Sequence, residues 1–160
     1  MCNPANFKQI QNIHARAFTL IELLVTISIV ATLLAIAVPS FREFVSGQRI
    51  KTASYDIFYT LTYMRSEAIK RNNDVTLTPA TGGWQNGWTV TVGTTTLSQH
   101  EAFPGLTITG PANNLIYSGN GHLKTAVNPF GISSSASTSL APRCVSINLS
   151  GLPNSKTGSC

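Results

Sequence analysis

Glu22 is the residue whose type and position most clearly indicate chemistry in this chain. It is the only charged residue in the 21-residue run 18–38, which is otherwise almost wholly apolar. An ionised side chain inside a membrane costs a few kcal/mol even on the most lenient scale. A carboxylate at this position therefore predicts a specific polar contact. A helix that served only as a membrane anchor would not explain it.

The cysteine count predicts one disulfide. Cys2 precedes the apolar run, whereas Cys144 and Cys160 both follow it. Two cysteines on the far side of a membrane segment favour a disulfide, which would stabilise the fold by about 3 kcal/mol for a loop of about 15 residues. Two free thiols are the alternative.

The other polar residues form no catalytic or metal-binding pattern. His100 and His122 have no cysteine, histidine or carboxylate at the spacing of a metal site. No serine has the context of a nucleophile elbow, and the GNG segment at 119–121 is predicted to be a turn. We therefore expect no enzymatic activity, no cofactor and no metal.

The composition favours a β-rich domain outside the cytoplasm. Only 11% of the 160 residues are charged, and Ser, Thr, Asn and Gly are abundant. The formal net charge is +5. A surplus this small permits a polyanionic partner but does not argue for one.

The apolar run 18–38 is the element that positions Glu22. Its 21 residues are long enough to cross a membrane as a helix. A secretory signal peptide is one interpretation, because AIA at 35–37 matches a small-x-small cleavage site. A plain N-terminal anchor is a second. The basic residues on both sides of the run do not fix an orientation.

A third interpretation comes from the residues AFTLIELLVTISIVATLLAIAVPSF at 17–41. They closely resemble the N-terminus of type IV pilins and the related pseudopilins. The resemblance implies that a prepilin peptidase removes a leader, residues 1–17, between Ala17 and Phe18. It also implies that Phe18 is then N-methylated and that Pro39 lies at a helix kink. Ala17 departs from the family pattern, which has Gly before the cut.

Cleavage after Ala17 gives Glu22 a partner. The new ammonium at Phe18 would lie four residues before Glu22, on the same face of a helix. In the family, the matching carboxylate is thought to meet the amine of a neighbouring subunit during assembly. We therefore expect Glu22 to be an assembly residue.

The pattern after residue 40 predicts an α+β fold, with one long helix packed on an antiparallel sheet. An apolar stripe with steps of three and four continues the helix to Asn72. Alternating segments then predict six strands. The Ser-rich segment 131–139 is predicted to be a surface loop. The predicted strands begin at Val75, Trp88, Thr95, Leu106, Leu115 and Cys144.

A second resemblance narrows the family. MRSEAIKRNNDVTLTP at 64–79 and GWQNGWTV at 83–90 look like the GspH/FimT group of pseudopilins. Thr78 stands where that group usually has Cys, so a disulfide at that position is not expected. Trp84 and Trp88 are candidates for a contact patch, but packing of the sheet on the helix is the favoured explanation.

DNA binding is disfavoured. Some FimT-type members that act in DNA uptake carry a Gly-Arg-x-Arg motif near the C-terminus. Here Gly151 is kept, but Leu152 and Asn154 occupy the two Arg positions, which removes about two phosphate contacts. Arg143 and Lys156 remain as isolated candidates for a weak DNA contact, and the Cys-closed tail resembles the FimU-like minor pilins.

Together these features predict a structural minor pilin that joins the priming or tip complex of a type IV pilus. The expected partners are other minor pilins, the major pilin, the prepilin peptidase and the inner-membrane assembly platform. A minor pseudopilin of a type II secretion system and a DNA-binding uptake component are the alternatives. The expected organisation is a leader (1–17), a membrane and assembly helix (18–44) and a periplasmic head (45–160), first in the inner membrane and then in the filament.

Overall fold

The structure, a computed structural model, describes residues 18–160. The leader predicted over 1–17, with Cys2 and Ala17, lies outside the described residues. The chain forms two compact units, and the boundary between them falls between Val38 and Pro39.

A single long helix, α1, contributes to both units. It extends from Leu20 to Arg71 and contains Pro39, close to the expected 18–72. Its C-terminus is a Schellman motif, in which Asn72 adopts a left-handed φ of 48°. The N–H groups of Asn72 and Asn73 then donate to the carbonyls of Ile69 and Ala68. These bonds end the helix and turn the chain toward the first strand.

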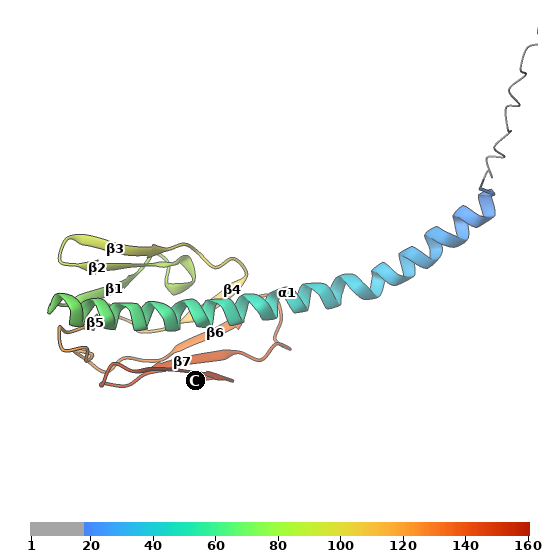
Figure 1. Cartoon of the computed structure of the whole chain (residues 1–160). Helices are drawn as coiled ribbons and strands as arrows, with labels where there is room; N and C mark the ends of the chain where they lie inside the picture. The colour runs from blue at the N-terminus through green and yellow to red at the C-terminus, as the bar shows by residue number, and fades with distance from the viewer. Residues whose placement is uncertain (1–17) are drawn as a thin grey trace, which may run out of the picture. The chain divides into compact units, whose positions relative to one another are not determined.

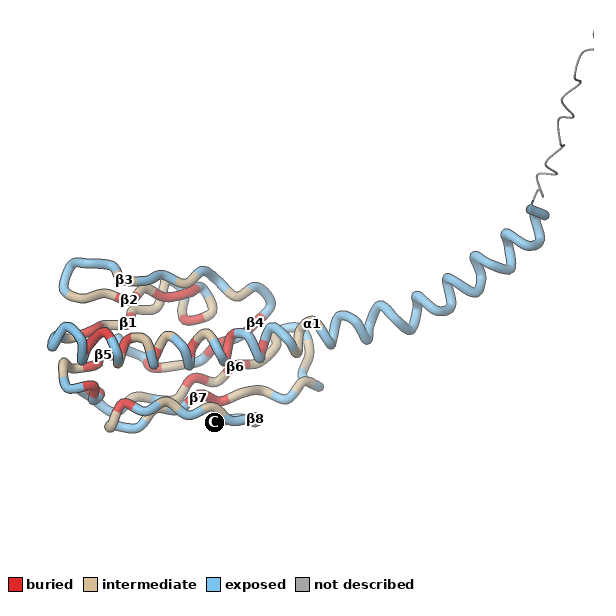
Figure 2. The backbone as a smooth tube through the Cα atoms, in the orientation of Figure 1, coloured by how far each residue is buried: buried red, intermediate tan, exposed pale blue. Residues whose placement is uncertain are grey.

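The second half of α1 carries the core stripe of the head. Its members recur every three or four residues, as the sequence predicted, and each is at most 2% exposed. They form one hydrophobic cluster with side chains from both β-sheets, and Figure 2 shows buried positions along this part of the helix and on the strands beside it. The stripe consists of Ile50, Ala53, Ile57, Leu61, Met64 and Ala68.

The strands form two four-stranded antiparallel sheets instead of one (Figure 1). The first has the order β3-β2-β1-β5, with bounds Thr95–His100, Trp88–Val92, Val75–Pro79 and Leu115–Tyr117. The second has the order β4-β6-β7-β8, with bounds Leu106–Thr109, Phe130–Ser134, Arg143–Ile147 and Pro153–Thr157.

Both tryptophans pack inside the head. Trp84, in the 3₁₀ turn Trp84–Asn86, meets the Phe130 ring edge-on at 4.9 Å, and its indole N–H donates to the Pro111 carbonyl over 2.9 Å. Trp88 stacks on His100 at 4.6 Å. The two side chains are 4% and 2% exposed, so they join the elements of the head and offer little surface to a partner.

The Ser-rich segment 131–139 is in part a strand, which corrects the loop prediction. Phe130 and Ile132 alternate inward from β6 and are fully buried, and Gly131 between them and the serines after them hide this period of two. Only the residues after Ser134 form a loop, in which the Ser134 hydroxyl accepts hydrogen bonds from the N–H groups of Ala136 and Ser137.

A close approach of two loops fixes the chain reversal before β8. The buried Tyr117 hydroxyl donates to the Gly151 carbonyl over 3.0 Å, and burial raises the pKa of Tyr117 to about 12. Gly151 has a φ of +79°, and a Cβ there would lie 2.1 Å from the Gly121 carbonyl oxygen. Both the left-handed φ and the lack of space for a Cβ therefore require glycine at this position.

We expect Gly151→Ala to lower the free energy of unfolding by at least about 2 kcal/mol, because left-handed strain adds to a backbone clash. Gly93→Ala is the matched control, since Gly93 has a φ of +55° with open space around it. Urea unfolding of the full chain in detergent, followed by tryptophan fluorescence, measures the difference. Equal midpoints for the two variants would contradict the packing role of Gly151.

Candidate functional site

The N-terminal unit presents an apolar surface on all sides. Every described side chain from 18 to 38 is exposed, and Phe18, Leu20 and Ile21 are 81%, 77% and 70% exposed. By length and composition, α1 could cross a membrane. A helix that is apolar all round needs lipid or other protein as its cover, so this surface is a candidate for both membrane insertion and subunit contact.

The hydroxyls of this helix half are already satisfied. Thr26, Ser28 and Thr32 each donate to a backbone carbonyl three or four residues earlier, over 2.7–2.8 Å. Such internal bonds let hydroxyl groups lie in an apolar medium at little cost. Glu22 is therefore the one ionisable side chain that this surface offers over residues 18–38.

Glu22 closes a capping box at the start of α1. Its Oε2 accepts hydrogen bonds from the backbone N–H of Thr19 (3.3 Å) and from the Thr19 hydroxyl (3.2 Å). In return, the Glu22 N–H donates to the Thr19 hydroxyl oxygen over 3.2 Å. The Thr-x-x-Glu spacing is the sequence signature of this motif, and the sequence interpretation missed it. The contact between Glu22 and an amine at Phe18 stays a prediction.

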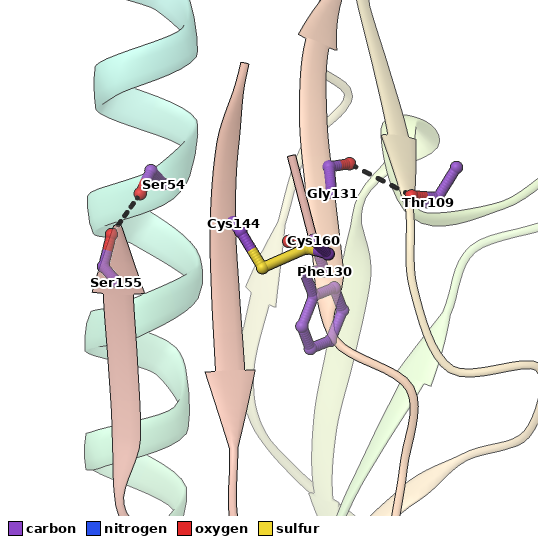
Figure 3. Close-up of a disulfide and its surroundings, with 7 residues drawn as sticks. All are labelled: Ser54, Thr109, Phe130, Gly131, Cys144, Ser155 and Cys160. Carbon is purple, nitrogen blue, oxygen red and sulfur yellow. Dashed lines mark hydrogen bonds between the residues drawn. A yellow bond between two sulfur atoms is a disulfide. The ribbon is translucent and has the colours of Figure 1, made fainter. Parts of the chain in front are cut away.

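A disulfide joins Cys144 and Cys160, with a Cα–Cα distance of 5.2 Å (Figure 3). It ties the end of the chain to β7, beside the Phe130 carbonyl, whose oxygen lies 3.3 Å from the Cys160 sulfur. Because a disulfide sulfur carries no proton, this approach is a packing contact. Of the two alternatives for these cysteines, the structure has the disulfide.

Arg143 and Lys156, the candidates for DNA contact, lie on opposite faces of the second sheet. Arg143 is paired with Thr157, while Lys156 is paired with Cys144, and neighbouring residues on a strand point to opposite faces. The Arg143 guanidinium lies 5.5 Å above the Tyr55 ring on the helix side. The two cations therefore do not form one basic patch.

Helix α1 and strand β8 lie side by side along a line that is called the α1–β8 seam here. The two elements are in contact in the middle of this seam, and a cavity lies at each of its ends. A hydrogen bond of 2.9 Å between the hydroxyls of Ser54 and Ser155 holds the middle (Figure 3). One end opens into a cavity of about 430 Å³, lined in part by Phe58, Ile69 and Leu152. The other opens into a cavity of about 440 Å³ near the start of the head.

Six large apolar side chains of residues 45–160 are exposed, and three of them, Phe58, Ile69 and Leu152, line the first of these openings. Leu152 stands at the first Arg position of the DNA-uptake motif and is 54% exposed. All of them come from the outer side of α1 or from the connection between β7 and β8. This outer patch consists of Tyr55, Phe58, Tyr59, Ile69, Leu149 and Leu152.

The charged groups at the end of α1 are largely paired. Arg71 Nε lies 2.6 Å from Glu67 Oε2, and Lys70 Nζ lies 3.7 Å from Glu67 Oε1. The hydrogen bond from Arg71, with a smaller contribution from Lys70, holds the pKa of Glu67 below its ordinary value. Arg65 Nε donates to the Gly121 carbonyl over 3.1 Å. Between residues 18 and 160, no group of three His, Cys, Asp or Glu residues is placed to hold a metal.

An exposed apolar helix with one carboxylate, continued into a helix that backs antiparallel sheets, defines a type IV pilin-like protein. A family model described as type II transport protein GspH matches residues 55–151, more than half of the 160-residue chain. The chain therefore belongs to the GspH family. A model of the prokaryotic N-terminal methylation motif matches residues 13–38.

Solved structures of minor pilins share the fold. The type IV minor pilin FimU of Pseudomonas aeruginosa has a TM-score of 0.63 at 23% identity, over 73% of this chain and 98% of that one. The minor pseudopilin EpsH of the type 2 secretion system of Vibrio cholerae has a TM-score of 0.53 at 17% identity, over 68% and 97%. No curated protein matches the sequence.

We expect replacement of both Cys144 and Cys160 by Ser to lower the free energy of unfolding by about 3 kcal/mol, because the open chain gains entropy when it unfolds. Urea unfolding of the full chain under non-reducing conditions measures the change. Cys2→Ser is the matched control, since it removes the third cysteine and leaves the disulfide intact. An unchanged midpoint in the double variant would show that the disulfide does not stabilise the head.

Proposed function

We propose that this chain is a structural minor pilin that joins the priming or tip complex of a type IV pilus. The observation that carries the proposal is the exposed apolar helix half with its single carboxylate at the N-terminus. The family match and the fold likeness to minor pilins support it. An enzymatic role finds no support in the described side chains.

In this proposal the apolar helix serves in two settings. Before assembly it anchors the chain in the inner membrane, with the head in the periplasm. The prepilin peptidase cuts between Ala17 and Phe18, the new N-terminus is methylated, and the assembly platform then moves the chain into the filament. There the same helix packs among the helices of other minor pilins and of the major pilin.

Glu22 acts in the second setting as a register element. After cleavage, its carboxylate meets the ammonium of Phe18 on a neighbouring subunit. A buried ion pair that loses one partner leaves an uncompensated charge, which costs about 3–5 kcal/mol. A subunit placed out of register therefore meets a large penalty, and a subunit in register does not.

The outer patch has a matching role in the head. Its exposed aromatic and aliphatic side chains include Tyr59 (70%) and Leu152 (54%), and three members, Phe58, Ile69 and Leu152, line the cavity at the end of the α1–β8 seam. Apolar surface of this kind is stabilised when a neighbouring head covers it. The Leu at position 152 thus supplies protein contact where the uptake motif has a phosphate-binding Arg.

The second candidate is a minor pseudopilin of a type II secretion system. The description of the matching family and the fold likeness to EpsH favour it. The two candidates differ in which set of minor subunits the chain binds. The third interpretation, a DNA-binding uptake component, gains nothing from Leu152, Asn154 or the separated Arg143 and Lys156.

We expect Glu22→Gln to abolish co-isolation of the chain with the minor pilins of the same cell, at least about a hundredfold by the ion-pair estimate. Gln can still close a capping box, so the variant removes the charge and keeps the helix start. Quantitative mass spectrometry of subunits captured with the full chain from detergent-solubilised membranes is the measurement.

The matched control is Glu101→Gln, which removes an exposed carboxylate of the head and should leave capture unchanged. Capture of type II secretion pseudopilins in place of pilus subunits would select the second candidate. Undiminished capture of pilus subunits by Glu22→Gln would contradict the register role of the carboxylate.

A further inference from the structure

The cavity at the start of the head, called the neck pocket here, combines an apolar wall with two cations. It has a volume of about 440 Å³ and lies between the first turns of α1 after Pro39, the loop before β7, and the end of β8. The lining includes Ser40, Glu43, Phe44, Lys51, Leu140 and Arg143.

Arg143 is the unusual group in this pocket. Its Nε is buried and has no hydrogen-bond partner among residues 18–160. Its guanidinium also has no carboxylate within 4.0 Å in that part of the chain, and the Tyr55 ring holds it in place from the helix side. A buried donor without an acceptor costs about 1–3 kcal/mol, and the Arg143 charge has no anionic partner among the described residues.

The charges around Arg143 favour a singly anionic ligand. Lys51 adds a second cation, and Glu43 adds one carboxylate, which accepts a hydrogen bond from the Ser139 hydroxyl over 3.1 Å. The net formal charge of the pocket side chains is therefore +1. Ser40 and Thr157 also line the pocket, and hydroxyl groups are suitable donors to phosphate oxygens.

The position of the pocket along the chain indicates the source of the anion. Ser40 follows the apolar run 18–38 by only two residues, and the headgroup layer begins where such a run ends. Phe41 and Phe44 are 67% and 62% exposed at this level, as aromatic residues at a membrane surface often are. Phe44, Leu140 and Ala141 provide an apolar wall, which a free phosphate would not need.

We propose that the neck pocket binds the headgroup phosphate of an anionic phospholipid. Arg143 and Lys51 hold the phosphate, and the apolar wall receives the first carbons of the acyl chains. This inference rests on the proposed membrane-anchored state before assembly. Its consequence is that the lipid holds the head at the bilayer surface until the chain leaves the membrane.

Native mass spectrometry of the full chain in detergent, titrated with phosphatidylglycerol or phosphatidylcholine, tests the site. We expect phosphatidylglycerol to bind more tightly, and Arg143→Gln to weaken it about tenfold by removing one charge-assisted contact. Lys156→Gln is the matched control, because it removes the same charge from the other face of the sheet, and it should change the affinity by less than about twofold.

A second variant separates binding from folding. Glu43→Gln removes the opposing carboxylate and should tighten phosphatidylglycerol binding, which a damaged fold would not do. Glycerol 3-phosphate should not displace the lipid at equal concentration.

If Arg143→Gln and Lys156→Gln weaken phosphatidylglycerol binding equally, the attraction would be a diffuse effect of positive charge, and the proposed lipid site in the neck pocket would be wrong. Displacement by glycerol 3-phosphate would make it a site for soluble phosphates. If Arg143→Gln binds lipid normally but captures fewer pilin subunits, the ligand of the neck pocket would be an acidic side chain of a neighbouring subunit and not a lipid. A failure of the membrane-anchored state on which this inference rests would look different, because the chain would then not be recovered from membranes at all. A failure of the pilus role alone would appear in the captured subunits and would leave lipid binding unchanged.

Discussion

The packing of one helical stripe against both sheets is the constraint on which the rest of the head depends. Ile57, Leu61 and Met64 belong to the same buried cluster as residues of the first sheet, such as Val75 and Leu115, and of the second, such as Phe130. Two four-stranded sheets share this one helix, so neither has a complete core without it. The opposite side of the same helix is thereby left uncovered, and it carries four of the six residues of the outer patch, Tyr55, Phe58, Tyr59 and Ile69. A single element thus sets both the stability of the head and the surface it offers to partners.

The seam between α1 and β8 is where structure and proposed function meet. The Ser54–Ser155 hydrogen bond closes its centre, and the disulfide anchors the residues that follow β8. The two openings then differ in chemistry. The one beside Leu152 joins apolar side chains to an Arg65 that already donates to the Gly121 carbonyl, and it suits another protein. The neck pocket has Arg143, which forms no ion pair within residues 18–160, and it suits an anion. Under the two proposals, these surfaces serve the filament and the membrane, the two environments proposed for the N-terminal helix.

The sequence predicted the elements whose pattern is local and missed those that depend on distant partners. The three-and-four spacing of Ile50 to Ala68 predicted the buried stripe, and alternation predicted the strands of the first sheet. Strand β6 was missed because Gly131 separates its two inward residues and serines follow them. Strand β8 was missed because PNSKT is polar and owes its strand geometry to hydrogen bonds with β7. Leu152 was noted only as a lost arginine, since its neighbours Phe58 and Ile69 lie more than 80 positions earlier. The Thr19–Glu22 capping box, in contrast, was readable from its spacing.

The most direct test of the central claim is N-terminal sequencing of the protein extracted from membranes. The claim is that the apolar helix is an assembly element. It stays in the mature protein after the leader is cut off between Ala17 and Phe18. The mature chain should then begin at Phe18, with a methylated amine four residues before Glu22. A chain that begins at Val38 would mean ordinary signal-peptidase cleavage after AIA at 35–37, and it would contradict the account, because the assembly helix and its carboxylate would be gone.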